Sequence, residues 1–222
     1  MKYQALLFII MFFPIVESIN AQNFKENFKD STLRIDYIFS GNTSSQSIAV
    51  DKLNVMPRWY GKTSRLSEVP VEGNGQITVT DYKTGEALYK NSFSTLFQEW
   101  LTYDEAKNNI RSFENVFLVP FPKKKVNVTI DLRNNRREII KSMTYTVDPE
   151  DILIKQIGFK DITPYEVLQQ AKDTTRCIHI AYIAEGYTKD EMQTFLNDAK
   201  IANDAIFEHE PFKTLKSKFN VD

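Results

Sequence analysis

The sequence predicts a mixed fold, in which an N-terminal all-β, sandwich-like domain is followed by an incomplete α/β segment. Runs of alternating apolar and polar residues, separated by turn residues, fill most of the chain up to residue 150. Beyond that point a compact apolar run, a glycine turn and a helical pattern follow one another, as in the first unit of an α/β layer. The predicted organisation is a signal peptide at residues 1–21, a β-domain at 22–150, a linker with a short helix at 151–175, and the start of an α/β domain at 176–222.

The first 21 residues have the layout of a secretory signal peptide. Ala5–Val16 is almost entirely apolar, and small or polar residues follow it. This stretch is shorter than the roughly 20 residues that cross a membrane, so an uncleaved anchor is the less favoured alternative. We expect cleavage after Ala21, with Ser18 as the alternative site. The mature chain is therefore expected to be secreted, periplasmic or on the surface of a bacterial cell, with no stable membrane span.

The composition narrows the class of protein. The 42% hydrophobic content and 16 Phe are enough for a packed core, which argues against wholesale disorder. A net charge of −1 gives no general attraction to nucleic acid. Cys177 is the one cysteine, so no internal disulfide can form, and two histidines are little material for a His-rich metal site.

The strands of the β-domain are predicted from alternation and turn chemistry. Leu33–Phe39 alternates with a period of two, and Ser47–Val55 resumes an extended pattern after a Ser-Gly-Asn-Thr turn. Gln76–Tyr82 and Ala87–Tyr89 flank a Lys-Thr-Gly-Glu turn and predict a hairpin. Glu99–Arg111 is ambiguous between a short helix and a loop.

A second hairpin is predicted further along the chain. Lys125–Asp131 and Ile139–Val147 flank a tip that contains Asn134 and Asn135. Several short strands with turns at near-regular spacing are typical of a β-sandwich.

The pattern changes after Asp148-Pro149. Thr163 and Pro164 have the residue types of a helix start and predict a short helix that ends at Ala171. Arg176–Ala184 has the length of a buried strand, and Thr188 with Glu191 forms a capping-box sequence. The helix that follows should place one apolar stripe on one face: Met192, Phe195, Leu196, Ala199, Ala202 and Ile206.

Two aromatic pairs and two basic clusters are candidates for binding. Trp59-Tyr60 and Phe97…Trp100 could be platforms for sugar rings or for a partner, although large aromatics of a sandwich are more often core. Lys123–Lys125 and Arg133–Arg137 flank strands and turns, where solvated basic residues are expected. We therefore expect no nucleic-acid partner.

No set of catalytic residues is evident. Cys177 and His179 share a face of the predicted strand, but the run looks buried, so a packed thiol is favoured over a nucleophile. Glu208-His209-Glu210 lacks the second histidine of a His-Glu-x-x-His helix. There is no serine nucleophile elbow, phosphate loop or Cys-x-x-Cys pair, so we assign no catalytic residue and no metal ligand.

The second half of the chain nevertheless carries a familiar order of motifs. Ile178–Thr188 ends in a Gly-Tyr-Thr turn, and a helix, a Pro-Phe pair at Pro211 and the Phe-Asn-Val of Phe219–Val221 follow. This order resembles the opening of the peptidase domain in the IgA peptidase family of secreted zinc metallopeptidases, which often has Asp where this chain has Glu185. The segments Arg34–Asn42 and Pro57–Gly61 are similar to that family's N-terminal β-domain.

The resemblance implies a parent enzyme that hydrolyses protein or peptide substrates with Zn²⁺. The family's zinc-binding His-Glu-x-x-His helix lies well downstream of Phe-Asn-Val, so no zinc ligand or catalytic Glu can be assigned to a residue here. We expect the chain to supply the accessory β-domain of a truncated peptidase and to be inactive alone. The alternative is a stand-alone exported β-domain that binds a glycan or a host protein.

Overall fold

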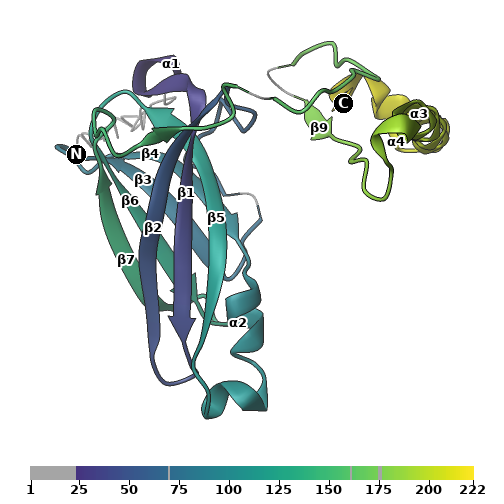
Figure 1. The fold of residues 1–222 in the computed structure, drawn as a ribbon. Coiled ribbons are helices and arrows are strands. Elements are labelled where there is room, and N and C mark those ends of the chain that lie inside the picture. Colours follow the sequence, from purple (N-terminus) through teal and green to yellow (C-terminus); the bar gives the residue numbers. More distant parts are fainter. Residues whose placement is uncertain (1–23, 70, 161, 175–176) are drawn as a thin grey trace, which may run out of the picture.

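The computed structural model describes residues 24–69, 71–160, 162–174 and 177–222. Figure 1 shows a long β-sandwich and, beside one of its ends, a smaller unit of strands and helices. The predicted mixed class, a β-sandwich followed by an α/β segment, is therefore confirmed. The predicted signal peptide lies outside the described residues.

The first sheet has the strand order β5-β1-β2-β8. A short helix α1 (Phe24–Asn27) leads into β1 (Phe28–Gly41), which pairs antiparallel with β2 (Gln46–Pro57) and with β5 (Arg111–Pro122). The two-residue strand β8 (Lys155–Gln156) adds to β2 in parallel. Strand β5 is thus one edge of this sheet and β8 is the other.

The second sheet has the order β4-β3-β6-β7 and is antiparallel throughout. It contains β3 (Gly75–Asp81), β4 (Ala87–Phe93), β6 (Val126–Arg133) and β7 (Ile139–Val147). Strands β3–β4 and β6–β7 are the two hairpins that the turn residues predict, and both are confirmed.

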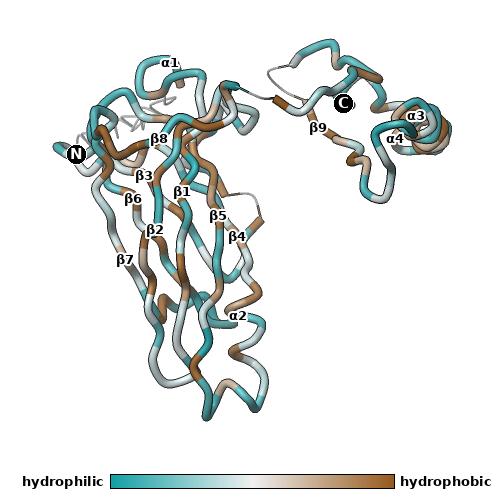
Figure 2. The backbone as a smooth tube through the Cα atoms, viewed as in Figure 1, coloured by the Kyte–Doolittle hydropathy of each residue, from teal (hydrophilic) through white to brown (hydrophobic). Residues whose placement is uncertain are grey.

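The sandwich core is filled by alternate residues of both sheets. Leu33, Ile35, Tyr37 and Phe39 of β1 point inward and are at most 1% exposed. They share one hydrophobic cluster with inward residues of the second sheet: Ile77, Val79, Val128 and Ile130. Figure 2 shows the resulting alternation of brown hydrophobic and paler or teal positions along the strands. Burial on this scale, at roughly 25 cal/mol per Å² of apolar surface, is what stabilises a sandwich without disulfides.

Aromatic side chains of the segment between β4 and β5 cover one end of the sandwich. The ambiguous insert Glu99–Arg111 holds the end of helix α2 (Leu96–Trp100), a 3₁₀ turn at Asp104–Lys107 and irregular chain that leads into β5. The Thr95 hydroxyl caps α2 by accepting a hydrogen bond from the Gln98 N–H, 3.1 Å away. Phe97 and Trp100 then face inward and are 0% and 5% exposed. These two aromatics are therefore core residues, not exposed platforms.

The short helix predicted to run from Pro164 to Ala171 is wrong, because this segment is not helical. The amide of Gln169 donates to the Val221 carbonyl at 3.1 Å, and the Val221 amide donates back to the Gln169 carbonyl at 2.8 Å. The Gln169 side chain also donates to the Lys216 carbonyl. These long-range bonds hold the backbone extended, which a local helix-start signal does not anticipate.

The α/β unit is built around a parallel pair of strands, β9 (Ile178–Ile180) and β10 (Phe219–Val221). Helix α3 (Met192–Glu208) and the short α4 (Phe212–Leu215) connect them, with 3₁₀ turns at Lys189–Glu191 and Lys216–Lys218. Strand, helix and parallel strand make a βαβ unit.

The start of the helical segment follows the predicted capping box. The Thr188 amide donates to a carboxylate oxygen of Glu191 at 2.9 Å, and the Thr188 hydroxyl receives the reciprocal bond from the Glu191 amide. The helix that follows buries Ala199, Asn203 and Phe207. Ala199 of the predicted apolar stripe is buried. Ala202, which the pattern also places on the buried face, is exposed, and Asn203 is buried instead.

The prediction that Arg176–Ala184 is a buried strand is wrong. Strand β9 covers three residues, and Ile178 is 55% exposed. From this segment, Ile180 and Tyr182 pack against the small core of the unit, which consists of Phe207, Phe219 and Val221. With a single neighbouring strand and little covering its face, β9 is exposed among the described residues.

Candidate functional site

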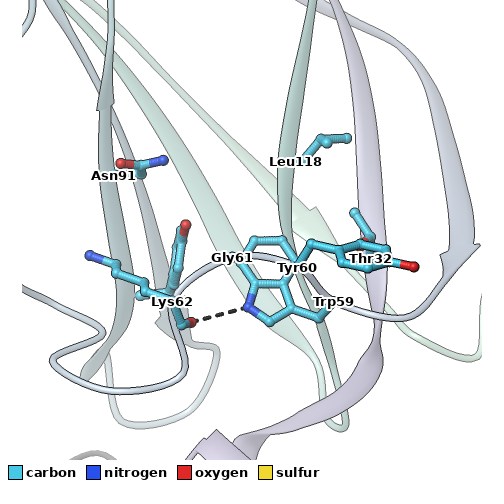
Figure 3. A pocket seen from close by; sticks show the side chains of 8 residues that line it. Thr32, Trp59, Tyr60, Gly61, Lys62, Asn91 and Leu118 are labelled. Atoms are coloured by element: carbon cyan, nitrogen blue, oxygen red, sulfur yellow. Dashed lines mark hydrogen bonds between the residues drawn. The ribbon is translucent and has the colours of Figure 1, made fainter. Parts of the chain in front are cut away.

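A cleft of about 450 Å³ opens at the side of the sandwich where the edge strands β4 and β5 approach each other. The ring centroids of Phe93 in β4 and Phe117 in β5 are 4.2 Å apart, which shows how closely these two edge strands approach. Figure 3 shows the residues that line the cleft, contributed by three strands and the loop after β2. They include Thr32, Trp59, Tyr60, Lys62, Asn91 and Leu118.

The loop that carries Trp59 and Tyr60 is fixed by hydrogen bonds. The Thr32 hydroxyl donates to the Arg58 carbonyl at 2.6 Å, and the Trp59 amide donates to the Asp30 carboxylate at 3.1 Å. The Trp59 indole N–H donates to the Lys62 carbonyl at 3.1 Å, which is the dashed line in Figure 3. Each of these donors therefore has a partner within the chain.

The indole also explains why residue 61 is a glycine. A Cβ atom on Gly61 would lie 2.2 Å from the Trp59 ring. Trp59 also meets Tyr89 edge-on, with ring centroids 5.9 Å apart. The Trp59 ring is thus packed closely against both Gly61 and the buried Tyr89.

Two titratable groups sit inside the cleft. The Lys62 ammonium donates to the Glu68 carbonyl and lies 5.1 Å from the Tyr89 ring centroid, and burial lowers its pKa. Burial raises the pKa of Tyr89 to about 12, so its phenol stays neutral. The cleft can stack a ring against Tyr60 and offer polar contacts from Asn91 and Lys62, but its residues include no nucleophile with an adjacent base.

The Cys177–His179 pair lies on the α/β unit and reaches the Tyr60 edge of this cleft through His179. The thiol sulfur is 3.4 Å from Nε2 of His179. Burial, and then the charge of Asp173, raises the pKa of the thiol, which disfavours the thiolate that a nucleophile needs. The His179 ring also meets Tyr60 edge-on at a centroid distance of 5.6 Å.

The acidic segment at the end of α3 does not form a metal site. Glu208, His209 and Glu210 are all exposed. Across the described residues, no three His, Cys, Asp or Glu side chains come together to hold a metal ion. The residues described here therefore do not fit the zinc site that the family resemblance implies for its parent enzyme.

The two basic clusters engage in local contacts. Lys125 pairs with Asp148 at 3.0 Å, and this side-chain hydrogen bond lowers the pKa of the Asp148 carboxyl. Arg133 and Arg137 both approach Glu72. Lys125, Arg133 and Arg137 thus each face an acidic side chain, as is common at solvated turns and sheet edges.

Within the part of the chain that the structure describes, no helix has the length and apolar character needed to cross a membrane.

Comparison with known proteins identifies both structural units. The family model described as Peptidase M64 N-terminus matches residues 23–144, which run from the start of the sandwich into β7. The model described as IgA Peptidase M64 matches residues 167–222, which begin just before the Gln169–Val221 pairing and include the whole βαβ unit. No curated protein matches the chain.

Proposed function

Because the chain belongs to the M64 peptidase family, we propose that it is the N-terminal portion of an exported zinc metallopeptidase whose full-length parent hydrolyses peptide bonds. In this proposal the β-sandwich is an accessory domain and the βαβ unit is the first part of the peptidase domain. The catalytic motif belongs to a different segment of the parent. The chain by itself is then inactive towards peptides.

The observation that carries this proposal is how little of the βαβ unit is buried. Its core contains three buried hydrophobic residues, Phe207, Phe219 and Val221. Large apolar side chains around this core remain open, and the most exposed are Ile178 at 55%, Ile183 at 83% and Ile201 at 69%. Parallel strands occur almost only in sheets that are covered on both faces. The unit therefore has the surface of a domain fragment that further strands and helices cover.

We expect zinc to be bound by the full-length parent enzyme. A bound Zn²⁺ would polarise the peptide carbonyl and lower the pKa of a water molecule. Since the described residues include no ligand cluster, we assign no step of that reaction to them.

Export and domain boundaries are part of the same proposal. We propose removal of residues 1–21, a β-domain at 22–150, a linker at 151–175 and a peptidase segment from 176, in a secreted, periplasmic or cell-surface protein. N-terminal sequencing of the exported protein tests the first point. A mature chain that starts at Gln22 or Ile19 supports it, and retention of Met1 contradicts it.

The reading frame after Asp222 tests the proposal at the level of the gene. A continuation into a His-Glu-x-x-His helix supports a peptidase whose N-terminal portion is described here. A stop codon directly after Asp222 in a verified genome contradicts it.

The cleft supports a second candidate function, the binding of a glycan or a host protein. The observation in its favour is that Tyr60, at 62% exposed, lines the same cleft as the polar side chains of Asn91 and Lys62. Aromatic rings next to polar groups suit both sugars and protein partners. A glycan array probed with the mature chain and with Tyr60→Ala tests the glycan arm, because specific binding should depend on that ring.

A further inference from the structure

The loop from Arg58 to Lys62 holds a defined shape at the end of β2. Arg58 has φ 59°, in the left-handed region that non-glycine residues rarely adopt. Such a conformation persists where surrounding contacts determine it, and here the bonds from Thr32 and to Asp30 secure both sides of the Arg58–Trp59 peptide. The sandwich thus fixes the direction in which the next residue, Tyr60, points.

Tyr60 projects from this loop towards the α/β unit. Its ring and the His179 ring of β9 are 5.6 Å apart at an interplanar angle of 80°. Edge-to-face contact at this separation is a preferred arrangement of aromatic rings. Tyr60 is otherwise 62% exposed, so the packing of the sandwich does not require it to be aromatic.

The linker leaves the sandwich at the same corner. Strand β8 pairs with Asn54 and Val55 of β2, and the Ile157 amide donates to the Val55 carbonyl at 3.0 Å. Only Met56 and Pro57 separate Val55 from the Arg58–Lys62 loop. The α/β unit is therefore tethered close to Tyr60, which gives a single contact a high effective concentration.

The contact also fits the position of His179 within its own unit. His179 lies on β9 beside Asn220 of β10, so a ring that holds His179 orients the central strand pair of the unit. The sulfur of Cys177 lies 3.4 Å from Nε2 of the imidazole. The His179 ring therefore has one neighbour in its own unit and one in the sandwich.

We propose that the Arg58–Lys62 loop is a docking element, in which Tyr60 seats His179 and so fixes the orientation of the peptidase segment on the β-sandwich. The proposal deepens the accessory role given above and rests on it for its biological purpose, but the contact itself is independent of catalysis. In this proposal, His179 of strand β9 in the same chain occupies the edge of the cleft that Tyr60 forms.

Amide ¹⁵N relaxation of the mature chain tests this docking. The sandwich and the α/β unit should tumble with one rotational correlation time. Tyr60→Ala should separate them, so that amides of α3 report a shorter correlation time than amides of β1 and β6. His179→Ala should have the same effect from the other side of the contact. The ring-current shift of the His179 imidazole protons should disappear in Tyr60→Ala.

Two variants serve as controls. Tyr60→Phe keeps the ring and should keep a single correlation time and the shifted His179 protons. Tyr82→Ala removes a similarly exposed tyrosine elsewhere on the sandwich and should change neither readout. Separate tumbling of the two units in the unmodified chain, or a single correlation time that survives both Tyr60→Ala and His179→Ala, would overturn the proposal. Neither readout involves zinc or hydrolysis, so failure of the docking leaves the peptidase assignment intact, and the reverse also holds.

Discussion

At the scale of single residues, the shape of the cleft depends on a few side chains, each of which is held by several contacts. The indole N–H of Trp59 has an acceptor, and its ring packs closely against Gly61 and the buried Tyr89 ring. The sequence offered Trp59-Tyr60 and Phe97…Trp100 as equivalent aromatic pairs, because composition does not reveal which rings a loop leaves outside. The structure separates them: Phe97 and Trp100 are core, whereas Tyr60 is exposed.

Gly61→Ala should disturb the cleft. The new Cβ would meet the Trp59 ring at 2.2 Å, and that ring is held by its bond to Lys62. We expect a loss of about 1–3 kcal/mol in the free energy of unfolding, typical of overpacking. The Trp59 indole N–H resonance should also shift. Ser64→Ala, an exposed position in the same loop, is the control and should stay within about 0.5 kcal/mol of the unmodified protein. Equal stability of the two variants would contradict this account of Trp59.

Asp81 should make the β3–β4 turn sensitive to acid. Its carboxylate accepts hydrogen bonds from the Thr84 and Lys83 amides, at 2.8 and 2.9 Å. The Thr84 amide is the first cause of a pKa below the ordinary value of 3.8. Since the folded pKa is the lower one, the contribution of Asp81 to stability is fully present above pH 3.8 and is lost as the pH falls through the folded pKa.

The NMR titration of the Asp81 carboxyl carbon measures this pKa directly. Asp81→Asn keeps an acceptor oxygen but removes the titration, so its stability should depend less on pH in the acid range. A carboxyl that titrates at or above 3.8 would contradict the proposed role of the turn.

At the scale of elements, the sandwich is closed at one end by a cluster of rings from several segments. Phe39 of β1 lies 6.1 Å from Phe97 of α2 and 6.1 Å from Phe117 of β5, measured between ring centroids. It also stacks on Phe93 of β4 at 6.5 Å. This one side chain joins the two sheets and the helix that covers their end.

Phe39→Ala should therefore cost about 3–5 kcal/mol of unfolding free energy, the usual range for a buried phenylalanine. Ile110→Ala is the matched control, because Ile110 is a large apolar residue near the same end but is 73% exposed. It should change stability by no more than about 0.5 kcal/mol. Urea unfolding followed by circular dichroism measures both, and comparable losses would show that the ring cluster is not the main support of this end.

The elements that sequence patterns could predict are those whose signals are local. Alternation in Leu33–Phe39 and the turn residues of both hairpins led to the correct strands. Strand β5 escaped prediction because Pro120 and Pro122 argue against a strand, although an edge strand tolerates proline. The segment Thr163–Ala171 was wrongly predicted to be a helix. Its local sequence favours a helix, but Gln169 pairs instead with Val221, about fifty residues away. The cleft could not be predicted either, because it joins β1, β4, β5 and the loop after β2.

At the scale of the whole molecule, the chain divides into a well-packed sandwich and a βαβ unit with a small core. The family match follows the same division, with one model over the sandwich and another over the unit. Between them the linker exposes apolar side chains, with Ile152 at 94% and Leu153 at 75%. Both features are those of a junction between two domains.

Limited proteolysis should cut this junction first. Chymotrypsin cleaves after large apolar and aromatic side chains, and the linker presents Leu153, Phe159 and Tyr165, all well exposed. We expect an early fragment that ends between residues 153 and 165 and a sandwich that resists further digestion. Mass spectrometry of the time course identifies the cut. Changing these three residues to Ser should delay it, and early cleavage within β1 or β6 would contradict the division into two units.

The chain belongs to the M64 peptidase family, and we propose that it is the N-terminal portion of such a peptidase and holds none of its catalytic machinery. Peptide hydrolysis by the mature chain from residue 22, assayed with a fluorogenic peptide mixture and added Zn²⁺, tests it most directly. We expect no hydrolysis above the background of Zn²⁺ alone. Zinc-dependent hydrolysis that a chelator abolishes and that co-purifies with the chain would contradict it.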